Sequence, residues 1–512
     1  MLYLSVFILW KEEVVMKKVL SGIFYIIFIL AFTILLFNIV FINEKAFFKP
    51  NILFLFINII ICFLLFYLFY IVWKKFIKHK KIFFIIAFIL FIILQFLFLY
   101  AFEVYPSWDY KDVFDGVKAD VLLNKSIFKN IYFYTYTNNI GLGILYKFFF
   151  LIFKLFRFKD LMYLHGITVV NIVFIDIALL YLYKIFRLYN TNENSMFLLI
   201  CSFFITPFIT YGPIAYTDTF SLPFAVISIY FFLKYVTGNK QDNKLFIISG
   251  LFLGFGLCLK FSLIVILVAY IIYILFTNEK IKEKLVIMAL LICFTFIPYL
   301  NLSIIEKVCM DEKVLNEEKL PYTHWLMMGV NDDGITVGGY SELDFRNTSE
   351  YKTKKLKKEY NKKVISQRLQ DKVLNKKLLN FYTRKVAYQW GDGSFYSTII
   401  LERYPVRKIN VRKYIIGITY DMKTYYLLCQ TQLIIIISMI ILSVLLKRYL
   451  TEKEKNILFL NSIIIFGVFL FFILWETRSR YLINFIPVLL IEVYLGVVAC
   501  KRLIFEKVRR KV

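Results

Sequence analysis

Charge, proline, glycine and histidine are all scarce in this sequence of 512 residues. Only 19% of the residues are charged, and the chain contains 9 prolines, 19 glycines and 3 histidines. So little proline and glycine excludes collagen-like and linker-rich chains. His79, His165 and His324 are too far apart in the sequence to indicate a metal-binding cluster. All but one or two of the 7 cysteines lie in apolar runs, which is typical of small apolar residues and not of a disulfide framework.

Apolar residues are the most abundant class. They make up 60% of the chain, aromatic residues make up 20%, and the mean hydropathy is +0.70. Soluble domains average about 45–50% apolar and about 25% charged residues, so the composition predicts a polytopic membrane protein. The net charge of +27, from 62 Lys and Arg against 35 Asp and Glu, is then expected mainly at cytoplasmic rims. No nucleic-acid partner is needed to explain it.

The apolar runs predict the membrane-spanning segments. A hydrocarbon core of about 30 Å needs about 20 apolar residues per helix. Helices are also the spanning element that satisfies its own backbone hydrogen bonds. We therefore expect an all-α protein with about 12 transmembrane helices, near residues 18–42, 51–73, 82–102, 166–186, 195–212, 219–236, 245–260, 262–277, 285–304, 428–446, 457–474 and 483–500.

Basic residues in the short loops predict the orientation. The strongest cytoplasmic marker is the Lys-rich loop 74–81, and with it inside, both termini are cytoplasmic. The Lys, Ile, Phe and Asn bias is typical of an AT-rich bacterial genome, which places the protein in the plasma membrane. This scheme requires residues 141–159, an apolar run with several cations, to be an amphipathic helix in the outer interface. If that run were an ordinary span, every later loop would change sides.

The scheme leaves two large segments outside. Residues 103–165 form the first, within an N-terminal membrane module of residues 1–304. Residues 305–427 form a small, mostly helical extracytoplasmic cap, followed by C-terminal membrane helices and a basic tail at 428–512. Trp325 and Trp390 in the cap either contact an acceptor or pack the cap onto the membrane domain.

Acidic residues near the outer rim are the first candidates for function. Asp109 and Asp112 come with Trp108 after the third span, and a carboxylate flanked by aromatic rings suits a general base. A solvated acidic loop is the alternative. Asp218 follows Tyr216 in a tight outer turn, where it either serves the site or caps the next helix.

Cations at the same rim are the second group. Lys260 stands between two apolar runs, where an ammonium group binds a lipid phosphate or snorkels to the interface. Arg478 and Arg480 stand beside Tyr481 in a short outer loop, and two guanidinium groups there indicate a phosphate or pyrophosphate clamp. Pairing with Glu476 accounts for only one of them.

In this order, these residues resemble the C-type glycosyltransferases (GT-C fold). These membrane enzymes, which include the protein O-mannosyltransferases and the aminoarabinose transferases of lipid A, take a sugar from a polyprenyl-phosphate carrier. The resemblance covers most of the chain. It implies, in order, a catalytic aspartate at Asp109, an interfacial helix at 141–159, a second acid at Asp218, a lysine that contacts the carrier phosphate at Lys260, and a late segment near the site at Arg480-Tyr481 with Pro487.

The resemblance also implies a mechanism and partners. Asp109, favoured over Asp112 because Trp108 adjoins it, deprotonates an acceptor hydroxyl that displaces the polyprenyl phosphate with inversion. Lys260 and Arg480 stabilise the leaving phosphate. The substrate-binding residues are then Trp108, Tyr216, Asp218, Lys260, Arg478, Arg480 and Tyr481. The partners are a polyprenyl-phosphate-linked sugar, a cell-envelope acceptor and the bilayer; no cofactor is firmly indicated, and a divalent cation is the one candidate.

Three other functions stay open at this point. A flippase or transporter of lipid-linked saccharides also explains outer cations and aromatic helices. Two large outer segments and the absence of an evident internal repeat speak against it. A polymerase of lipid-linked repeats would use outer arginines in place of an aspartate base. A scaffold would need none of these residues.

Overall fold

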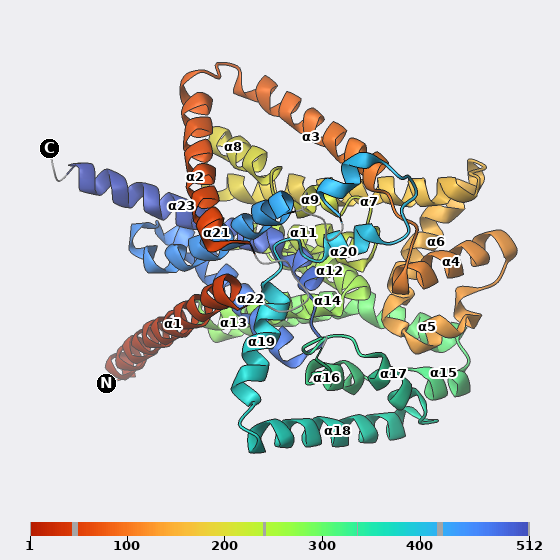
Figure 1. Cartoon of the computed structure of the whole chain (residues 1–512). Helices are drawn as coiled ribbons and strands as arrows, with labels where there is room; N and C mark the ends of the chain where they lie inside the picture. Colours follow the sequence, from red (N-terminus) through yellow and green to blue (C-terminus); the bar gives the residue numbers. More distant parts are fainter. Residues whose placement is uncertain (1, 43–49, 239–241, 335, 417–422, 510–512) are drawn as a thin grey trace.

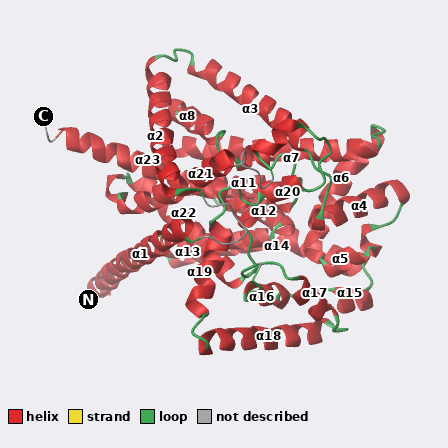
Figure 2. Ribbon diagram, in the orientation of Figure 1, coloured by secondary structure: helices red, strands yellow, loops and turns green. Residues whose placement is uncertain are grey.

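In a computed structural model the chain forms a bundle of α-helices (Figures 1 and 2). The structure describes residues 2–42, 50–238, 242–334, 336–416 and 423–509. Among these residues there is no strand, and β-type pairing is limited to isolated bridges at Val104–Pro405 and Asp332–Val337. The prediction of an all-α fold is therefore confirmed for the described part of the chain.

The N-terminal part of the chain runs to the end of α14, at Cys309. Its helices are α1 (Leu2–Phe41), α2 (Ile52–Lys75), α3 (Lys80–Phe102), α4 (Trp108–Leu123), α5 (Ile131–Thr135), α6 (Ile140–Leu155), α7 (Asp160–Tyr189), α8 (Asn192–Ser202), α9 (Pro207–Thr210), α10 (Thr217–Phe220), α11 (Leu222–Thr237), α12 (Lys244–Leu259), α13 (Ile264–Phe276) and α14 (Ile281–Cys309). A single 3-10 turn, η3 (Phe261–Leu263), joins α12 to α13.

The remaining helices belong to the large loop segment and the C-terminal bundle. They are α15 (Glu312–Glu318), α16 (Thr323–Gly329), α17 (Glu342–Ser349), α18 (Lys354–Leu374), α19 (Leu378–Trp390), α20 (Ser397–Glu402), α21 (Lys423–Leu445), α22 (Glu452–Leu474), the 3-10 helix η7 (Ser479–Phe485) and α23 (Ile486–Arg509).

Ten helices in the described residues are long and apolar enough to cross a membrane. Nine coincide with spans expected from the sequence, and the tenth, Thr137–Leu155, covers the segment expected in the interface. The expected spans 245–260 and 262–277 are shorter apolar helices, α12 and α13. The polytopic membrane architecture is thus supported, with about ten candidate spans. The total of twelve stays a prediction.

The prediction of one continuous span at 195–212 is wrong. Helix α8 ends at Ser202, and after a turn the chain forms only the short α9. Pro207 contributes to the break because it lacks an N–H and its ring clashes with a preceding carbonyl. The side chain of Gln432 on α21 replaces the lost backbone bonds: it accepts from Thr206 N at 3.2 Å and donates to Phe204 O at 2.7 Å. Side-chain contacts of this kind allow irregular backbone within an apolar bundle.

The packing of α12 against α14 fixes the end of α12. Gly250 and Gly254, four residues apart on α12, face α14, and a Cβ at Gly254 would overlap the carbonyl oxygen of Thr295. Small residues at this spacing let two helix backbones approach closely. The backbone of Lys260 is extended, which ends α12 and starts η3. The turn that carries Lys260 is therefore mounted on a tightly packed helix pair.

Helix α6 lies with α4 and α5 at the end of the bundle away from both chain ends, called the cavity end below (Figure 1). Two cations of its basic stripe contact α4: Lys147 pairs with Asp120 at 2.9 Å, and Lys154 donates to Val121 O at 2.5 Å. Both cations therefore have hydrogen-bond partners within the protein. Because length and composition also make α6 a candidate span, its placement in the interface stays a prediction.

The large loop segment consists of two differently packed parts. Helices α15–α18 form a layer along one side of the cavity end (Figure 1), and this part of residues 305–427 is mostly helical. Helix α19 instead packs against α1 and α22. Its Trp390 is buried and meets Phe32 edge-on, with ring centroids 6.1 Å apart. Of the two alternatives for Trp390, packing onto the membrane domain is the one observed.

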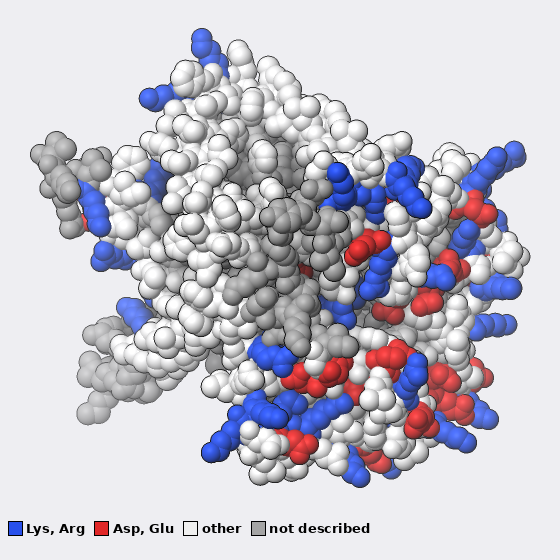
Figure 3. Space-filling model, viewed as in Figure 1, with Lys and Arg blue, Asp and Glu red and all other residues white. Residues whose placement is uncertain are grey.

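Charged side chains gather over one part of the surface. In Figure 3 they cover the region of α4–α6 and α15–α18, whereas the surface over α2 and α3 is mostly uncharged. Helix α2 illustrates the second kind of surface, since Leu53, Phe56 and Leu65 are all more than half exposed. An apolar helix with so little protein contact is stable when lipid surrounds it.

Candidate functional site

A cavity of about 1340 Å³ lies at the cavity end, between the membrane helices and the large loop segment. It is lined by eight of the nine residues predicted for the site: Trp108, Asp109, Asp112, Tyr216, Lys260, Arg478, Arg480 and Tyr481. Leu257, Leu302 and Phe471 on α12, α14 and α22 add an apolar wall. One space therefore offers ionisable groups beside a surface that accepts hydrocarbon.

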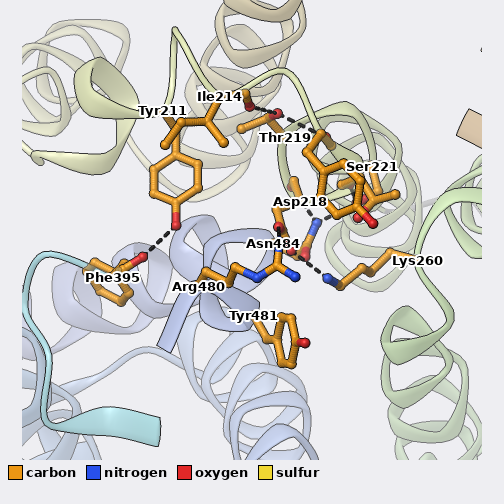
Figure 4. Close-up of polar contacts among 12 residues, drawn as sticks. Tyr211, Ile214, Asp218, Thr219, Ser221, Lys260, Phe395, Arg480, Tyr481 and Asn484 are labelled. Carbon is orange, nitrogen blue, oxygen red and sulfur yellow. Dashed lines mark hydrogen bonds and ion pairs between the residues drawn. The ribbon is translucent and has the colours of Figure 1, made fainter. Parts of the chain in front are cut away.

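The ninth residue, Asp218, does not line the cavity but contacts two of the cations that do (Figure 4). Its Oδ1 is 2.5 Å from Lys260 Nζ, and its Oδ2 is 3.3 Å from Arg480 Nη1. Its side chain is only 1% exposed. A single carboxylate thus faces two cations, so the group of three keeps a net positive charge toward the cavity.

The turn that carries Asp218 is fixed by neighbouring helices. Asn171 on α7 donates to the carbonyl oxygens of Tyr211 and Gly212 at 2.8 and 2.9 Å. Asn484 on η7 donates to the backbone oxygen of Asp218 at 2.7 Å. The alternative of Asp218 as an N-cap is not observed, because Asp218 lies within α10 and its carboxylate points to the cations. The packing of the surrounding helices therefore fixes the position of Asp218.

Arg480 is surrounded by aromatic rings. Its guanidinium carbon lies 5.8 Å from the ring centre of Trp108, 5.3 Å from that of Tyr216 and 5.0 Å from that of Tyr481. Lys260 Nζ lies 4.3 Å from the ring centre of Tyr481. Cations over aromatic faces in a dry site gain electrostatic energy that water would otherwise supply. Tyr481 therefore connects the two cations that Asp218 also holds.

Asp109, in the first turn of α4, is partly buried and lines the cavity. Burial raises the pKa of its carboxyl, while the positive charge of Arg480 and a hydrogen bond with Tyr132 oppose that shift. Asn139 orients Tyr132 by donating to its hydroxyl at 2.5 Å. A carboxyl with a raised pKa accepts a proton more readily than an ordinary aspartate, as a general base requires.

Asp112 stands one turn later on α4 and is exposed. Burial raises its pKa first, and the negative charge of Asp109 raises it further. The charge of the neighbouring Lys111 opposes these two effects and lowers the pKa. Both acids line the cavity, and Asp109 is the one in the neighbourhood of Arg480 and Tyr132.

The described contacts of Arg478 are with Tyr396 and differ from the pairing with Glu476 considered above. Arg478 donates to the hydroxyl of Tyr396, and its guanidinium lies 4.8 Å from the centre of that ring. Glu476 accepts a hydrogen bond from Tyr481 at 3.0 Å. Burial raises the pKa of Glu476, which the charges of Arg478 and Arg480 oppose. Both arginines line the cavity, and the described hydrogen-bond partner of Arg478 is Tyr396.

Asp392 helps to shape the site, although no role for it was predicted from the sequence. Its buried carboxylate accepts from Ser394 N and Oγ, Tyr396 N and Ser479 Oγ at 2.6–2.9 Å. Gly393 beside it contacts the backbone of Cys429 so closely that a Cβ would overlap it. The signal in the sequence was the run Trp390-Gly391-Asp392-Gly393-Ser394-Phe395. The hydrogen bond from Ser479, which lies between the two arginines, could not be predicted from the sequence.

Other lining residues were missed because the sequence gives no local signal for them. Tyr132, Tyr136 and Tyr396 come from distant segments, and Arg403 lies 5.5 Å from the ring centre of Trp108. Trp325, expected to contact an acceptor or pack the cap, lines the cavity and also stacks on Trp475 at 6.1 Å. No group of three or more His, Cys, Asp or Glu side chains suited to a metal ion occurs among the described residues.

Comparison with known proteins gives a match to one family model. A family model described as conserved hypothetical integral membrane protein matches residues 13–501. Neither a curated protein nor a solved structure gives a significant match.

Proposed function

The chain belongs to this family of conserved hypothetical integral membrane proteins, and we propose that it is a glycosyltransferase that moves a sugar from a polyprenyl-phosphate carrier to an acceptor hydroxyl. The observation that carries the proposal is the cavity that brings Asp109, Lys260 and Arg480 together beside an apolar wall. A lipid-linked sugar phosphate needs all three features: a base, cations for its phosphate, and a surface for its chain.

The proposed reaction is a single displacement. Asp109 takes the proton of the acceptor hydroxyl as the oxygen attacks the anomeric carbon. The bond from that carbon to the phosphate oxygen breaks, and its electron pair leaves with the polyprenyl phosphate. Attack opposite to the leaving group inverts the anomeric configuration. Lys260 and Arg480 stabilise the charge that develops on the leaving phosphate, which needs no proton.

Asp218 has a positioning role in this scheme. It holds Lys260 and Arg480 through opposite oxygens, so the two cations stay apart by a fixed distance in the absence of substrate. Prearranged charges in a water-poor site cost little reorganisation during the reaction. Trp108, Tyr216 and Tyr481 supply flat faces next to these charges, which suit a sugar ring.

We also propose a location, which the distribution of basic residues in the sequence supports. If the site faces the extracytoplasmic side, both termini and the Lys-rich loop 74–81 lie in the cytoplasm, in agreement with the positive-inside bias. The acceptor is then a cell-envelope glycan, lipid or protein, and the membrane is the plasma membrane.

The test is sugar transfer by purified protein. The protein is incubated with a panel of polyprenyl-phosphate sugars, and consumption of each donor is followed. In the presence of an acceptor, Asp109→Asn should lower turnover by about 10²–10⁴-fold, the usual contribution of a positioned general base. Asp115→Asn is the matched control, because Asp115 is exposed on the same helix and does not line the cavity.

A transporter of lipid-linked saccharides predicts a different outcome. Such a protein would move the carrier between leaflets without consuming it, and Asp109→Asn would leave translocation intact. Full sugar transfer by Asp109→Asn at a normal protein level would sink the assignment of the base.

A further inference from the structure

Lys385 on α19 joins the large loop segment to the segment that carries Arg478 and Arg480. Its side chain is buried, and its Nζ donates to three backbone carbonyl oxygens: Gly329 at 2.5 Å, Ile473 at 2.8 Å and Trp475 at 2.8 Å. An ammonium group has three N–H donors. All three are therefore used on main-chain oxygens.

The three carbonyls lie where two helices end. Gly329 is the last residue of α16, Ile473 is in the last turn of α22, and Trp475 directly follows α22. The last carbonyls of a helix have no partner within the helix and carry a partial negative charge. The Lys385 ammonium donates hydrogen bonds to carbonyls at the C-terminal ends of both helices, and so connects α16 to α22.

The surrounding backbone fits closely around this lysine. Gly338 has a φ of +69°, and a Cβ there would lie 2.6 Å from Lys385 Cε. Gly338 O accepts from Thr477 N at 2.8 Å, which places Gly338 beside the segment that follows α22. A Cβ at Gly329 would come within 2.5 Å of Leu474 O. Both positions need glycine because these segments of the chain leave no room for a Cβ atom.

We infer that Lys385 is a positioning residue that holds the turn after α22 in the register that directs Glu476, Arg478 and Arg480 to the cavity. Lys385 itself does not line the cavity. It acts through Ile473 and Trp475, immediately before Glu476. The consequence for sugar transfer rests on the proposed function, whereas the consequence for the turn does not.

Lys357 provides a matched control. It is also buried, and it also donates to backbone carbonyls, those of Glu317 at 2.6 Å and Glu318 at 3.0 Å. These contacts tie α18 to the end of α15 and do not involve α22. Loss of Lys357 therefore removes a buried lysine of the same kind without touching the arginine-bearing turn.

Amide hydrogen exchange on the full-length protein in lipid nanodiscs tests the positioning. In Lys385→Met, amides of residues 474–481 should exchange about tenfold faster or more, the effect of losing charged hydrogen bonds on local opening. Lys357→Met should leave this peptide unchanged. Lys385→Gln, which keeps two N–H donors, gives a second variant if Lys385→Met does not fold. Wild-type protection of 474–481 in the tested Lys385 variants, or equal loss of protection in Lys357→Met, would overturn the inference.

Steady-state kinetics gives the second readout. A misplaced arginine stabilises the transition state less well. Lys385→Met should therefore lower kcat per folded enzyme by about tenfold, with the KM for the donor within about threefold of the wild-type value. A merely structural role would lower the yield of folded enzyme and leave kcat unchanged, and that result would overturn the inference. If the wild-type protein transfers no sugar, the proposed function fails while the exchange experiment still decides the role of Lys385.

Discussion

The carboxylate of Asp218 and the ammonium of Lys260 lie 2.5 Å apart, although 42 residues separate them in the chain. The same carboxylate contacts Arg480, which comes 262 residues later. Three segments that each looked like an isolated polar exception in an apolar sequence therefore form one buried ionic group.

Removing Asp218 should destabilise the protein. Asp218→Ala leaves Lys260 and Arg480 largely buried without their shared counter-ion, and breaking a buried pair typically costs about 3–5 kcal/mol. Thermal unfolding in detergent, with Asp115→Asn as a control for an exposed acid, measures the effect. An unchanged unfolding temperature for Asp218→Ala would mean that the three groups are not coupled as described.

The pH dependence of sugar transfer should report Asp109. A general base works when deprotonated, so activity rises with pH through the pKa of Asp109, which burial raises above its ordinary value of 3.8. The hydrogen bond with Tyr132 lowers this pKa. Tyr132→Phe removes that bond, so the acidic limb of the pH profile should move to higher pH. Tyr105→Phe, an exposed tyrosine that does not line the cavity, should leave the limb in place; a limb that stays put in Tyr132→Phe as well would exclude Asp109 as the titrating group.

Asp392 should matter although it does not line the cavity. Asp392→Ala removes four hydrogen-bond acceptor contacts, including the one with Ser479 between the two arginines. We expect a lower unfolding temperature, because buried donors left without partners cost about 1–3 kcal/mol each. We also expect a lower kcat at equal folded protein. Ser479→Ala breaks only the link to the arginine turn, so it should lower kcat with a smaller loss of stability.

Close packing of α12 on α14 predicts a contrast between two glycines. Gly254→Ala places a methyl group against the Thr295 carbonyl and should destabilise by about 1–3 kcal/mol, the usual effect of overpacking. Gly22 has open space around its Cβ position. Gly22→Ala should therefore be neutral or slightly stabilising, since alanine favours a helix over glycine. Equal unfolding temperatures for both variants would contradict the described helix contact.

Cysteine labelling decides whether α6 crosses the membrane. Single cysteines at Lys129 and Lys159, on either side of α6, are placed in a variant without native cysteines and exposed to a membrane-impermeant maleimide on intact cells. If α6 lies in the interface, both positions label from the same side. Labelling of only one of them would make α6 a span and reverse the predicted orientation of every later loop.

Hydropathy was sufficient for the membrane helices but not for their interruptions. Nine expected spans agree with long helices because about 20 apolar residues in a row have one favourable environment. The span at 195–212 failed because Gln432, more than two hundred residues away, replaces the backbone bonds that are lost at the break near Pro207. A distant partner of this kind leaves no local pattern.

The candidate site divides in a similar way. Trp108, Asp109, Lys260 and Arg480 could be selected from the sequence because polar groups among apolar spans are costly and need a reason. The partner of Arg478 could not, since Tyr396 reaches it from the large loop segment. Asp392 and Lys385 are ordinary polar residues of a charged segment until the fold buries them.

The sequence by itself determined that this is an integral membrane protein built from helices, and it determined which charges need an explanation. These properties follow from composition and local periodicity, which act on neighbouring residues. The tertiary structure decided that Asp218 faces both Lys260 and Arg480, and that Asp392 and Lys385 hold the arginine turn. Those contacts depend on how the helices pack, because the free energy of burying a charge is set by partners that only the complete fold brings within reach.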